Sequence, residues 1–235
     1  MKKNQIKGIC RYCGKESILC NAHILPKSFY RLDLGKRFGD PYNKNPIYQN
    51  GLKDNNILCS TCDGILGEYD KEASRILIKE INKHNSEGFK TLYTYEAKEF
   101  NYKKLRYFLI SLLWRTSIST LPQLAEFNIG KYEDIALKIL KGEIPDNSNM
   151  FGTYICKRPK NDNINEIVLF KKNYIQNKPA YAFSFPDYLI IIMPEKESIL
   201  GKYDAISEDG LFFCETCNDV FGIKEDLKST FPNKF

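Results

Sequence analysis

The sequence predicts an α+β protein: short strands and a helix at the N-terminus, a helical middle and a β-rich C-terminal region. Apolar residues recur at helical spacing in three segments between residues 63 and 141, and strand-like apolar runs replace them from residue 151 onward. The chain has 235 residues, of which 43% are hydrophobic, so it is long enough for a sizeable core. The pattern changes near residues 85–90, which divides the chain into an N-terminal module, 1–87, and a C-terminal region, 88–235.

The N-terminal elements are expected to be short. Residues 6–24 predict two strands around the turn "CRYC", the second strand being "ESILCNAHI". Residues 30–57 are rich in Gly, Pro, Asn and Asp and predict mostly loop. Apolar residues at helical spacing then predict a helix from about Asp63 to His84.

The rest of the chain changes from helix to strand. A strand is expected in "TLYTYEAKEFNY", a mostly apolar core helix in "YKKLRYFLISLLWRTSI", and an amphipathic helix in "KYEDIALKILKGE", ended by Gly142 and Pro145. The later strands are expected in "FGTYICKR", "NEIVLFKKNYI", "AYAFSF" and "YLIIIMP", with a short helix after the last cysteine pair.

Composition excludes several classes of protein. The N-terminal "MKKNQIKGI" is not followed by the apolar stretch of a secretory signal. The longest apolar run, "FLISLLW", lies between Arg106 and Arg115 and is much shorter than the roughly 20 residues of a membrane span. We therefore expect a soluble, cytoplasmic protein with no membrane partner.

The 8 cysteines indicate metal binding, because cytoplasmic thiols stay reduced and paired spacings are typical of metal sites. Cys10 and Cys13 form one C-x-x-C pair on a hairpin turn. Cys59 and Cys62 form a second at the start of a helix, whose dipole favours thiolates. Together they predict a closed structural Zn²⁺ site; the alternative is two pairs of buried cysteines without metal.

A third pair leaves the number of zinc ions open. "CETCNDVFG", which holds Cys214 and Cys217, repeats the pattern of "CSTCDGILG" around the second pair. The repeat either forms another zinc site, completed by Cys156 and by Cys20 or His84, or competes for the first. Cys20 itself is more typical of a buried small apolar residue.

Basic residues outnumber acidic ones within the first 40 residues of a chain whose formal net charge is +6. This segment holds Lys27, Arg31 and Arg37, which we consider candidate contacts to a nucleic-acid backbone. The alternative is a solvated surface in a lysine-rich protein.

The order of these motifs resembles the HNH endonuclease family. The residues that carry the resemblance are "CRYC", "AHILPKSF" and "NNILCSTCDGILGEYD", and a later "SLLWR" at 111–115 also occurs in a bacterial subgroup with these motifs. The resemblance covers about residues 7–140 and is strongest in the first 75. It implies a ββα-metal, treble-clef-like module in which a histidine faces the first turn of a helix across a divalent metal.

The resemblance also implies roles for individual residues. His23 takes the position of the general base, Asn56 that of the asparagine that braces the histidine loop, and Asp63 that of a ligand to catalytic Mg²⁺ or a similar ion. Most family members carry an acidic residue where this chain has Ala22, so Asp70, two helical turns after Asp63, is the expected replacement ligand, with Glu68 a poorer fit by angle.

Each of these residues also has a structural interpretation. His23 would be a core histidine bonded to a backbone carbonyl, Asp63 a carboxylate at a helix N-terminus, and Asp70 a surface acid. His84 would only place a favourable charge at a helix C-terminus. Arg115, in the most apolar helix, is expected to pair with a Glu or Asp or else to reach a phosphate.

The function that the resemblance implies is metal-dependent hydrolysis of nucleic-acid phosphodiesters, with double-stranded DNA the expected partner and phage defence a biological context. The alternative is a non-catalytic zinc module that binds nucleic acid or protein. An RNA-directed or toxin-like nuclease is a third interpretation. A protein partner or homo-oligomer is left open.

Overall fold

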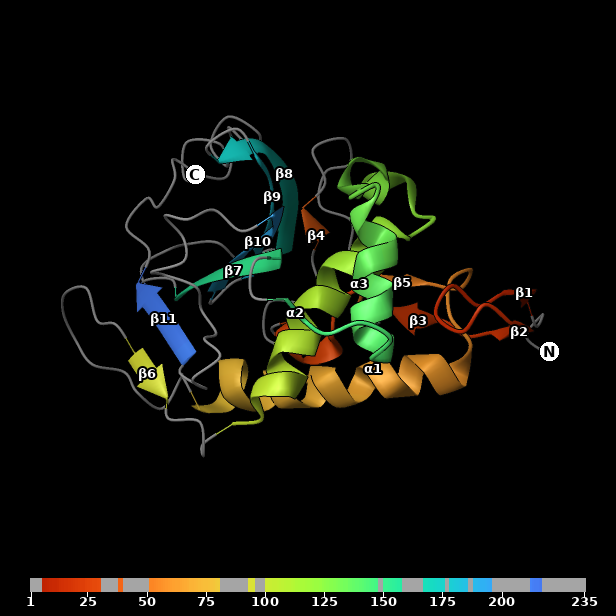
Figure 1. Cartoon of the computed structure of the whole chain (residues 1–235), viewed down its shortest axis with the longest axis horizontal. Helices are drawn as coiled ribbons and strands as arrows, with labels where there is room; N and C mark the ends of the chain where they lie inside the picture. The colour runs from red at the N-terminus through yellow and green to blue at the C-terminus, as the bar shows by residue number, and fades with distance from the viewer. Residues whose placement is uncertain are drawn as a thin grey trace. The chain divides into compact units, whose positions relative to one another are not determined.

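The computed structural model of the chain describes residues 6–30, 38–39, 51–80, 93–95, 100–147, 150–157, 167–175, 178–185, 188–195 and 212–216. Within these ranges the protein combines helices with antiparallel and mixed sheets (Figure 1), in agreement with the predicted α+β class. No helix among the described residues has the length and apolar character needed to cross a membrane.

The chain forms two compact units. The first consists of Met1–Phe29, Asn50–Lys83 and Asn101–Asp146, and the second of Tyr30–Gln49, His84–Phe100 and Asn147–Phe235. The helices that follow residue 100 therefore group with the N-terminal segments. The predicted division into an N-terminal module, 1–87, and a C-terminal region, 88–235, stays a prediction.

The first unit opens with a hairpin. Strand β1 (Ile6–Ile9) pairs antiparallel with β2 (Glu16–Leu19). The turn between them closes with a hydrogen bond from the backbone N–H of Gly14 to the carbonyl of Cys10, and Gly14 has a φ of 73° that suits a residue without Cβ.

The prediction of one continuous strand over "ESILCNAHI" is wrong in its second half. Strand β2 ends at Leu19, and the N–H of Cys20 donates to the carbonyl of Leu58 instead. Ala22 and His23 form a separate strand, β3 (Ala22–His23), which pairs with β5 (Lys53–Asp54). The predicted loop over 30–57 thus contains two short strands among its described residues, β5 and β4 (Phe38–Gly39). The sequence does not reveal β5, because its partner among the described residues, β3, also has two residues.

Three α-helices complete the first unit. Helix α1 (Ser60–Ala73) begins earlier than predicted and continues as a π-helical segment, η2 (Ser74–Glu80). The predicted helices at 102–118 and 131–143 are confirmed as α2 (Tyr102–Ser117) and α3 (Tyr132–Lys141), with Gly142 in the left-handed region at the end of α3. Short 3-10 segments, η1 (Lys27–Phe29) and η5 (Pro122–Phe127), connect the elements.

Helix α2 is the core of this unit. It packs against α1 and α3, and every side chain from Leu105 to Thr116 is buried. Most residues in this part of α2 are apolar, and their removal from water accounts for its buried position. Two arginines, Arg106 and Arg115, are buried with them, and each forms a salt bridge with an aspartate.

The second unit is built around a sheet with the strand order β4-β8-β9-β10-β7-β11-β6. Its predicted strands are confirmed as β7 (Met150–Lys157), β8 (Ile167–Ile175), β9 (Lys178–Ser184) and β10 (Tyr188–Glu195). Within "TLYTYEAKEFNY" the described strand is β6 (Tyr93–Tyr95), and β4 (Phe38–Gly39) and β11 (Phe212–Thr216) complete the order. The short helix expected after Cys217 lies outside the described residues.

Candidate functional site

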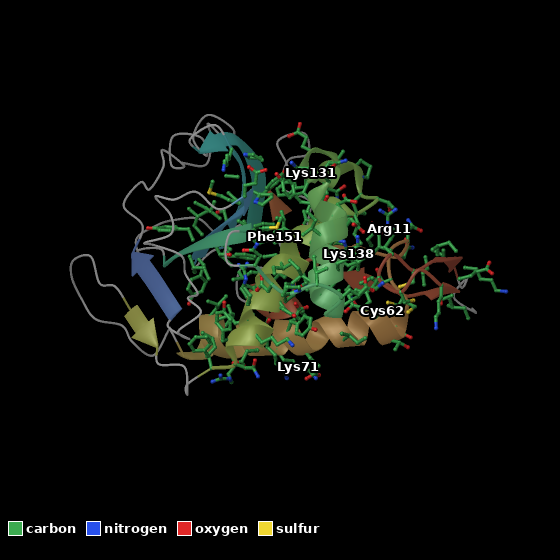
Figure 2. The ribbon with its side chains drawn as sticks, in the orientation of Figure 1. Arg11, Cys62, Lys71, Lys131, Lys138 and Phe151 are labelled. Carbon is green, nitrogen blue, oxygen red and sulfur yellow. The ribbon has the colours of Figure 1, made fainter. Side chains whose placement is uncertain are left out.

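Four cysteines of the first unit lie close enough together to hold a metal ion. The sulfur atoms of Cys10, Cys13, Cys59 and Cys62 all lie within 4.8 Å of one another. Four sulfurs around one zinc would be separated by about 3.8 Å, since a Zn–S bond is about 2.3 Å long. As predicted, the first pair lies on the hairpin turn, while Cys59 is the N-cap of α1 and Cys62 lies in its first turn (Figure 2).

The surroundings shift the pKa values of the cysteine thiols in opposite directions. Burial raises the pKa of the Cys10 thiol, but hydrogen bonds from the backbones of Cys13, Cys59 and Tyr12 outweigh it and lower that pKa to about 7. Burial and hydrogen bonds from neighbouring thiols raise the pKa of Cys62. The N–H of Cys59 donates to Sγ of Cys10 over 3.4 Å. Such N–H···S contacts favour thiolate sulfur, which is the form that binds metal.

The residues between the cysteines attach this cluster to the helical core. Tyr12 is buried, its hydroxyl donates to the carbonyl of Leu140 over 3.0 Å, and its ring lies edge-on to Trp114 with 6.0 Å between centroids. The N–H of Arg11 donates to the carbonyl of Ile57. The metal site, α2 and α3 therefore belong to one packed structure.

His23 lies where β3 meets the start of α1. The N–H of Ile24 donates to the carbonyl of Leu52, and in an antiparallel ladder this makes His23 and Lys53 a pair without mutual hydrogen bonds. The peptide groups of His23 consequently point away from β5. Its N–H bonds the Asp63 carboxylate, and its carbonyl accepts from Nη1 of Arg115 over 3.0 Å.

The imidazole of His23 is held neutral. Burial lowers the pKa of His23 to about 4, and the positive charges of Lys53, Arg115 and Lys27 act in the same direction, against the negative charge of Asp70. Its Nε2 is buried and has no hydrogen-bond partner among the described residues. A buried polar atom in this state is typical of a group that meets a water, an ion or a substrate.

Asp63 contacts the backbone of His23, and its predicted role as a ligand of a catalytic metal stays a prediction. It lies in the first turn of α1, directly after Cys62. Burial raises the pKa of Asp63; the positive charge of Arg115 opposes the rise and the negative charge of Asp70 adds to it. Among the described residues, the four cysteines form the one group of three or more metal-ligating side chains that lie close together, so a cation shared by Asp63 and Asp70 stays a prediction.

Asp70 has a different principal partner from the one expected. Both of its carboxylate oxygens accept hydrogen bonds from Arg115, at 2.7 and 3.0 Å. This salt bridge confirms the expectation that Arg115 pairs with an acidic residue, and Arg115 is 1% exposed. The role of Asp70 as a metal ligand stays a prediction, and it would require the carboxylate to be shared with the guanidinium.

Among the hydrogen bonds of the described residues, none joins Asn56 to strand β3. Its side chain donates to Oγ1 of Thr120 over 3.0 Å. The bracing role of Asn56 stays a prediction. Asp54 links the β3–β5 ladder to the segment after α2: it is 1% exposed, pairs with Ala22, and accepts from the backbone of Asn56 and Thr120 and from the Ser119 hydroxyl. The sequence offers no sign of this role, because Ser119 and Thr120 are distant along the chain.

Replacing Asp54 by Ala should therefore destabilise the first unit far more than replacing Asn56 by Ala. The first change removes a buried carboxylate and its several part-buried hydrogen bonds, which we expect to cost about 3 kcal/mol, whereas the second alters an exposed side chain and should cost about 0.5 kcal/mol. Urea unfolding followed by the fluorescence of Trp114 measures both. Equal losses of stability would contradict the assignment of Asp54.

Lys53 was not expected at the site. It faces His23 across the β3–β5 ladder, and it forms no salt bridge with any residue of the described ranges. Lys27 is exposed and also acts on the charge of His23. Arg31, Arg37 and His84 lie outside the described residues.

The remaining cysteines leave the second zinc a prediction. Cys156 lies in β7 and Cys214 in the neighbouring β11, where Cys156 is paired with Glu215. Cys217 lies outside the described residues. Cys20 lies near the first cluster: burial, followed by the negative charge of Asp63, raises the pKa of its thiol to about 11. That thiol stays protonated at neutral pH.

Comparisons of the chain with protein-family models, with curated proteins and with solved structures found no match. The resemblance to HNH endonucleases therefore depends on the sequence motifs alone.

Proposed function

We propose that this protein is a metal-dependent endonuclease of the HNH type, with a zinc-stabilised, treble-clef-like ββα module as its catalytic part. The observation that supports the proposal is the buried, unpartnered Nε2 of His23, on a strand whose N–H bonds Asp63 at the start of α1. The motifs that resemble the family and the cysteine cluster that opens the same helix agree with it.

The residues of the chain would divide the reaction between them. His23 is neutral at pH 7, so its ring can accept a proton from water. Asp63 would hold the cation. A bound divalent cation would neutralise charge on the scissile phosphate and on the departing 3′ oxygen. Lys53 and Lys27 would bring positive charge to the phosphodiester.

Substrate would also adjust the basicity of the histidine. The positive charges of Lys53, Arg115 and Lys27 contribute to the low pKa of His23 in the free protein. A phosphodiester bound beside Lys53 and Lys27 adds negative charge and should raise that pKa toward the working pH, where a general base is most effective.

A non-catalytic zinc module that binds nucleic acid is the second candidate, and one observation favours it. Ala22 is fully buried where most family members carry an acidic ligand, and Asp70 is engaged by Arg115. Asp63 is then the one carboxylate of the described cluster that does not already form a salt bridge, and one carboxylate holds Mg²⁺ weakly.

Plasmid cleavage with Mg²⁺, Mn²⁺ or Ni²⁺ should distinguish the two candidates. We expect the wild-type protein to cut and Asp63→Asn to lose at least about 100-fold in rate, since the amide cannot supply the charge that holds the cation. Asp134→Asn is the matched control, because Asp134 also lies in the first turn of a helix but is exposed and pairs with Lys138.

The outcomes separate the proposals. Cutting by the wild type and Asp134→Asn, but not by Asp63→Asn, supports the nuclease. Equal DNA binding by all three proteins without cutting supports the binding module. The same assay on RNA of matching sequence tests the preference for DNA. A role in phage defence stays a prediction of the resemblance.

A further inference from the structure

Arg115 connects three elements of the first unit. It lies in α2, its Nη2 and Nη1 hold the two oxygens of Asp70 in α1, and Nη1 also donates to the carbonyl of His23 in β3. Its Nε donates to the carbonyl of Ser111, one turn earlier in α2. The guanidinium therefore has partners on its own helix, on α1 and on β3.

The strand that carries His23 has little support of its own. Strand β3 has two residues, and among the described residues its strand partner is the two-residue β5. So short a ladder does not fix a side chain in one orientation by itself. The peptide groups of His23 point away from β5, and what holds them is Asp63 at the N–H and Arg115 at the carbonyl.

We propose that Arg115, held in place by Asp70, is a positioning residue for His23. The inference rests on the proposed function. The guanidinium fixes the peptide plane that follows the His23 Cα, and so restrains the backbone from which the imidazole projects. The planar guanidinium of Arg115 suits this role. Its Nη1 and Nη2 groups bind the Asp70 carboxylate, and Nη1 also donates to the His23 carbonyl.

Arg115 acts through His23 and not through the substrate. Its side chain is 1% exposed, so a phosphate cannot reach it without displacing the core. Loss of the contacts that Arg115 makes with Asp70 and with the His23 carbonyl should therefore lower kcat and leave KM for DNA close to that of the wild type. A shift of about 1 Å in a catalytic group costs about 100-fold in rate, which is the fall in kcat that we expect.

The same helix supplies a matched control. Arg106 forms a two-bonded salt bridge with Asp146, at 2.8 and 3.0 Å, and its side chain is 4% exposed. This pair resembles Arg115 and Asp70 in chemistry, burial and helix, but no bond between it and His23 is among the contacts of the described residues. A purely structural role would make the two pairs equivalent.

The experiment compares Arg115→Lys and Asp70→Asn with Arg106→Lys and Asp146→Asn. Each variant is assayed for kcat and KM of metal-dependent cutting, for its melting temperature, and for hydrogen exchange in the peptide that spans residues 20–25. Asp70→Asn keeps the shape of the side chain, so it serves if Arg115→Lys does not fold. Rates are compared at equal intervals below each melting temperature.

We expect Arg115→Lys and Asp70→Asn to lose about 100-fold in kcat with KM near that of the wild type, and to exchange faster at residues 20–25. The Arg106 and Asp146 variants should keep wild-type kcat and exchange at that strand. Equal losses of kcat in both pairs, or an unchanged exchange rate in the Asp70 variant, would overturn the inference.

Failure of the proposed nuclease function can be distinguished from failure of the inference about Arg115. If the wild-type protein cuts neither DNA nor RNA with any of the metals, the nuclease proposal is wrong. Hydrogen exchange alone then tests the positioning role of Arg115. Faster exchange at the His23 strand in Asp70→Asn, but not in Asp146→Asn, supports that role, and equal exchange in the two variants rejects it.

Discussion

Replacing Cys62 by Ser, or removing zinc with a chelator, should unfold the first unit. The four sulfurs join the hairpin turn to the start of α1, and a structural zinc contributes about 10–16 kcal/mol of apparent binding free energy. That is comparable with or larger than the whole stability of a typical domain, about 5–15 kcal/mol, so the folded unit should not persist without the metal.

The chain carries its own reporter of this unit. Trp114 is the single tryptophan, is buried in α2, and contacts Tyr12 of the first cysteine pair. Loss of the metal should expose it and move its fluorescence to longer wavelength, with loss of helical circular dichroism. Elemental analysis of the same samples should give at least one zinc per wild-type chain, and fewer in Cys62→Ser.

Cys20→Ser is the matched control for the cysteine variant. Cys20 is half-buried near the cluster, but it is not one of the four grouped cysteines, and its raised pKa keeps the thiol protonated. It should bind as much zinc as the wild type and melt at a similar temperature. If Cys62→Ser also kept its zinc and its melting temperature, the structural role of the metal would be disproved.

Replacing His23 by Ala should abolish cutting, with a loss of about 100- to 10,000-fold in rate. A positioned general base contributes that much, and no other imidazole belongs to the described site. Rates of plasmid cleavage at saturating metal measure the effect. His84→Ala, which changes the other of the chain's 2 histidines, should cut at the wild-type rate.

The pH dependence tests the same residue. Burial, reinforced by nearby positive charges, lowers the pKa of His23 from about 6.5 to about 4, so the base form persists below the pH at which a free histidine is protonated. A bound cation keeps Asp63 ionised over the same range. The acid limb of kcat/KM, which reports the free enzyme before substrate raises this pKa, should thus lie below pH 6.5. A limb at or above 6.5, or a His23→Ala variant that still cuts, would contradict the assignment.

The same pKa affects stability, with a definite sign. The folded-state pKa of His23 lies below its ordinary value, so the unfolded chain binds more protons between pH 6.5 and about 4. Stability should fall as the pH decreases through that range and should not change further from this group below it. His23→Gln should remove this part of the pH dependence while the rest of the acid unfolding remains.

Much of the fold can be predicted from local sequence patterns, such as the spacing of apolar residues, of cysteines and of helix-ending glycine. The core helix with Trp114 and the helix that ends at Gly142 follow from apolar spacing and from a residue that tolerates the left-handed region. Cys10 and Cys59 each belong to a C-x-x-C pair, and that spacing is enough to predict the grouping of the four sulfurs.

The site, in contrast, depends on contacts between residues that are distant along the chain. Arg115 meets Asp70 and the carbonyl of His23, and Asp54 meets Ser119 and Thr120, only because α2 crosses α1 beside a two-residue strand. The continuous strand predicted through Cys20 was wrong for the same reason: its N–H found a partner at Leu58.

By itself, then, the sequence determined helices α2 and α3, most of α1, strands β6 to β10 of the second unit, the cysteine cluster and the candidates His23 and Asp63, but not strands β4 and β11. Those features follow from spacing along the chain, where each residue's neighbours are known. The tertiary structure alone decided that Asp70 pairs with Arg115, that Asp54 bonds the segment after α2, and that Lys53 faces the histidine. A buried charge takes whichever partner the packing of the helices brings within reach, and spacing along the chain does not contain that information.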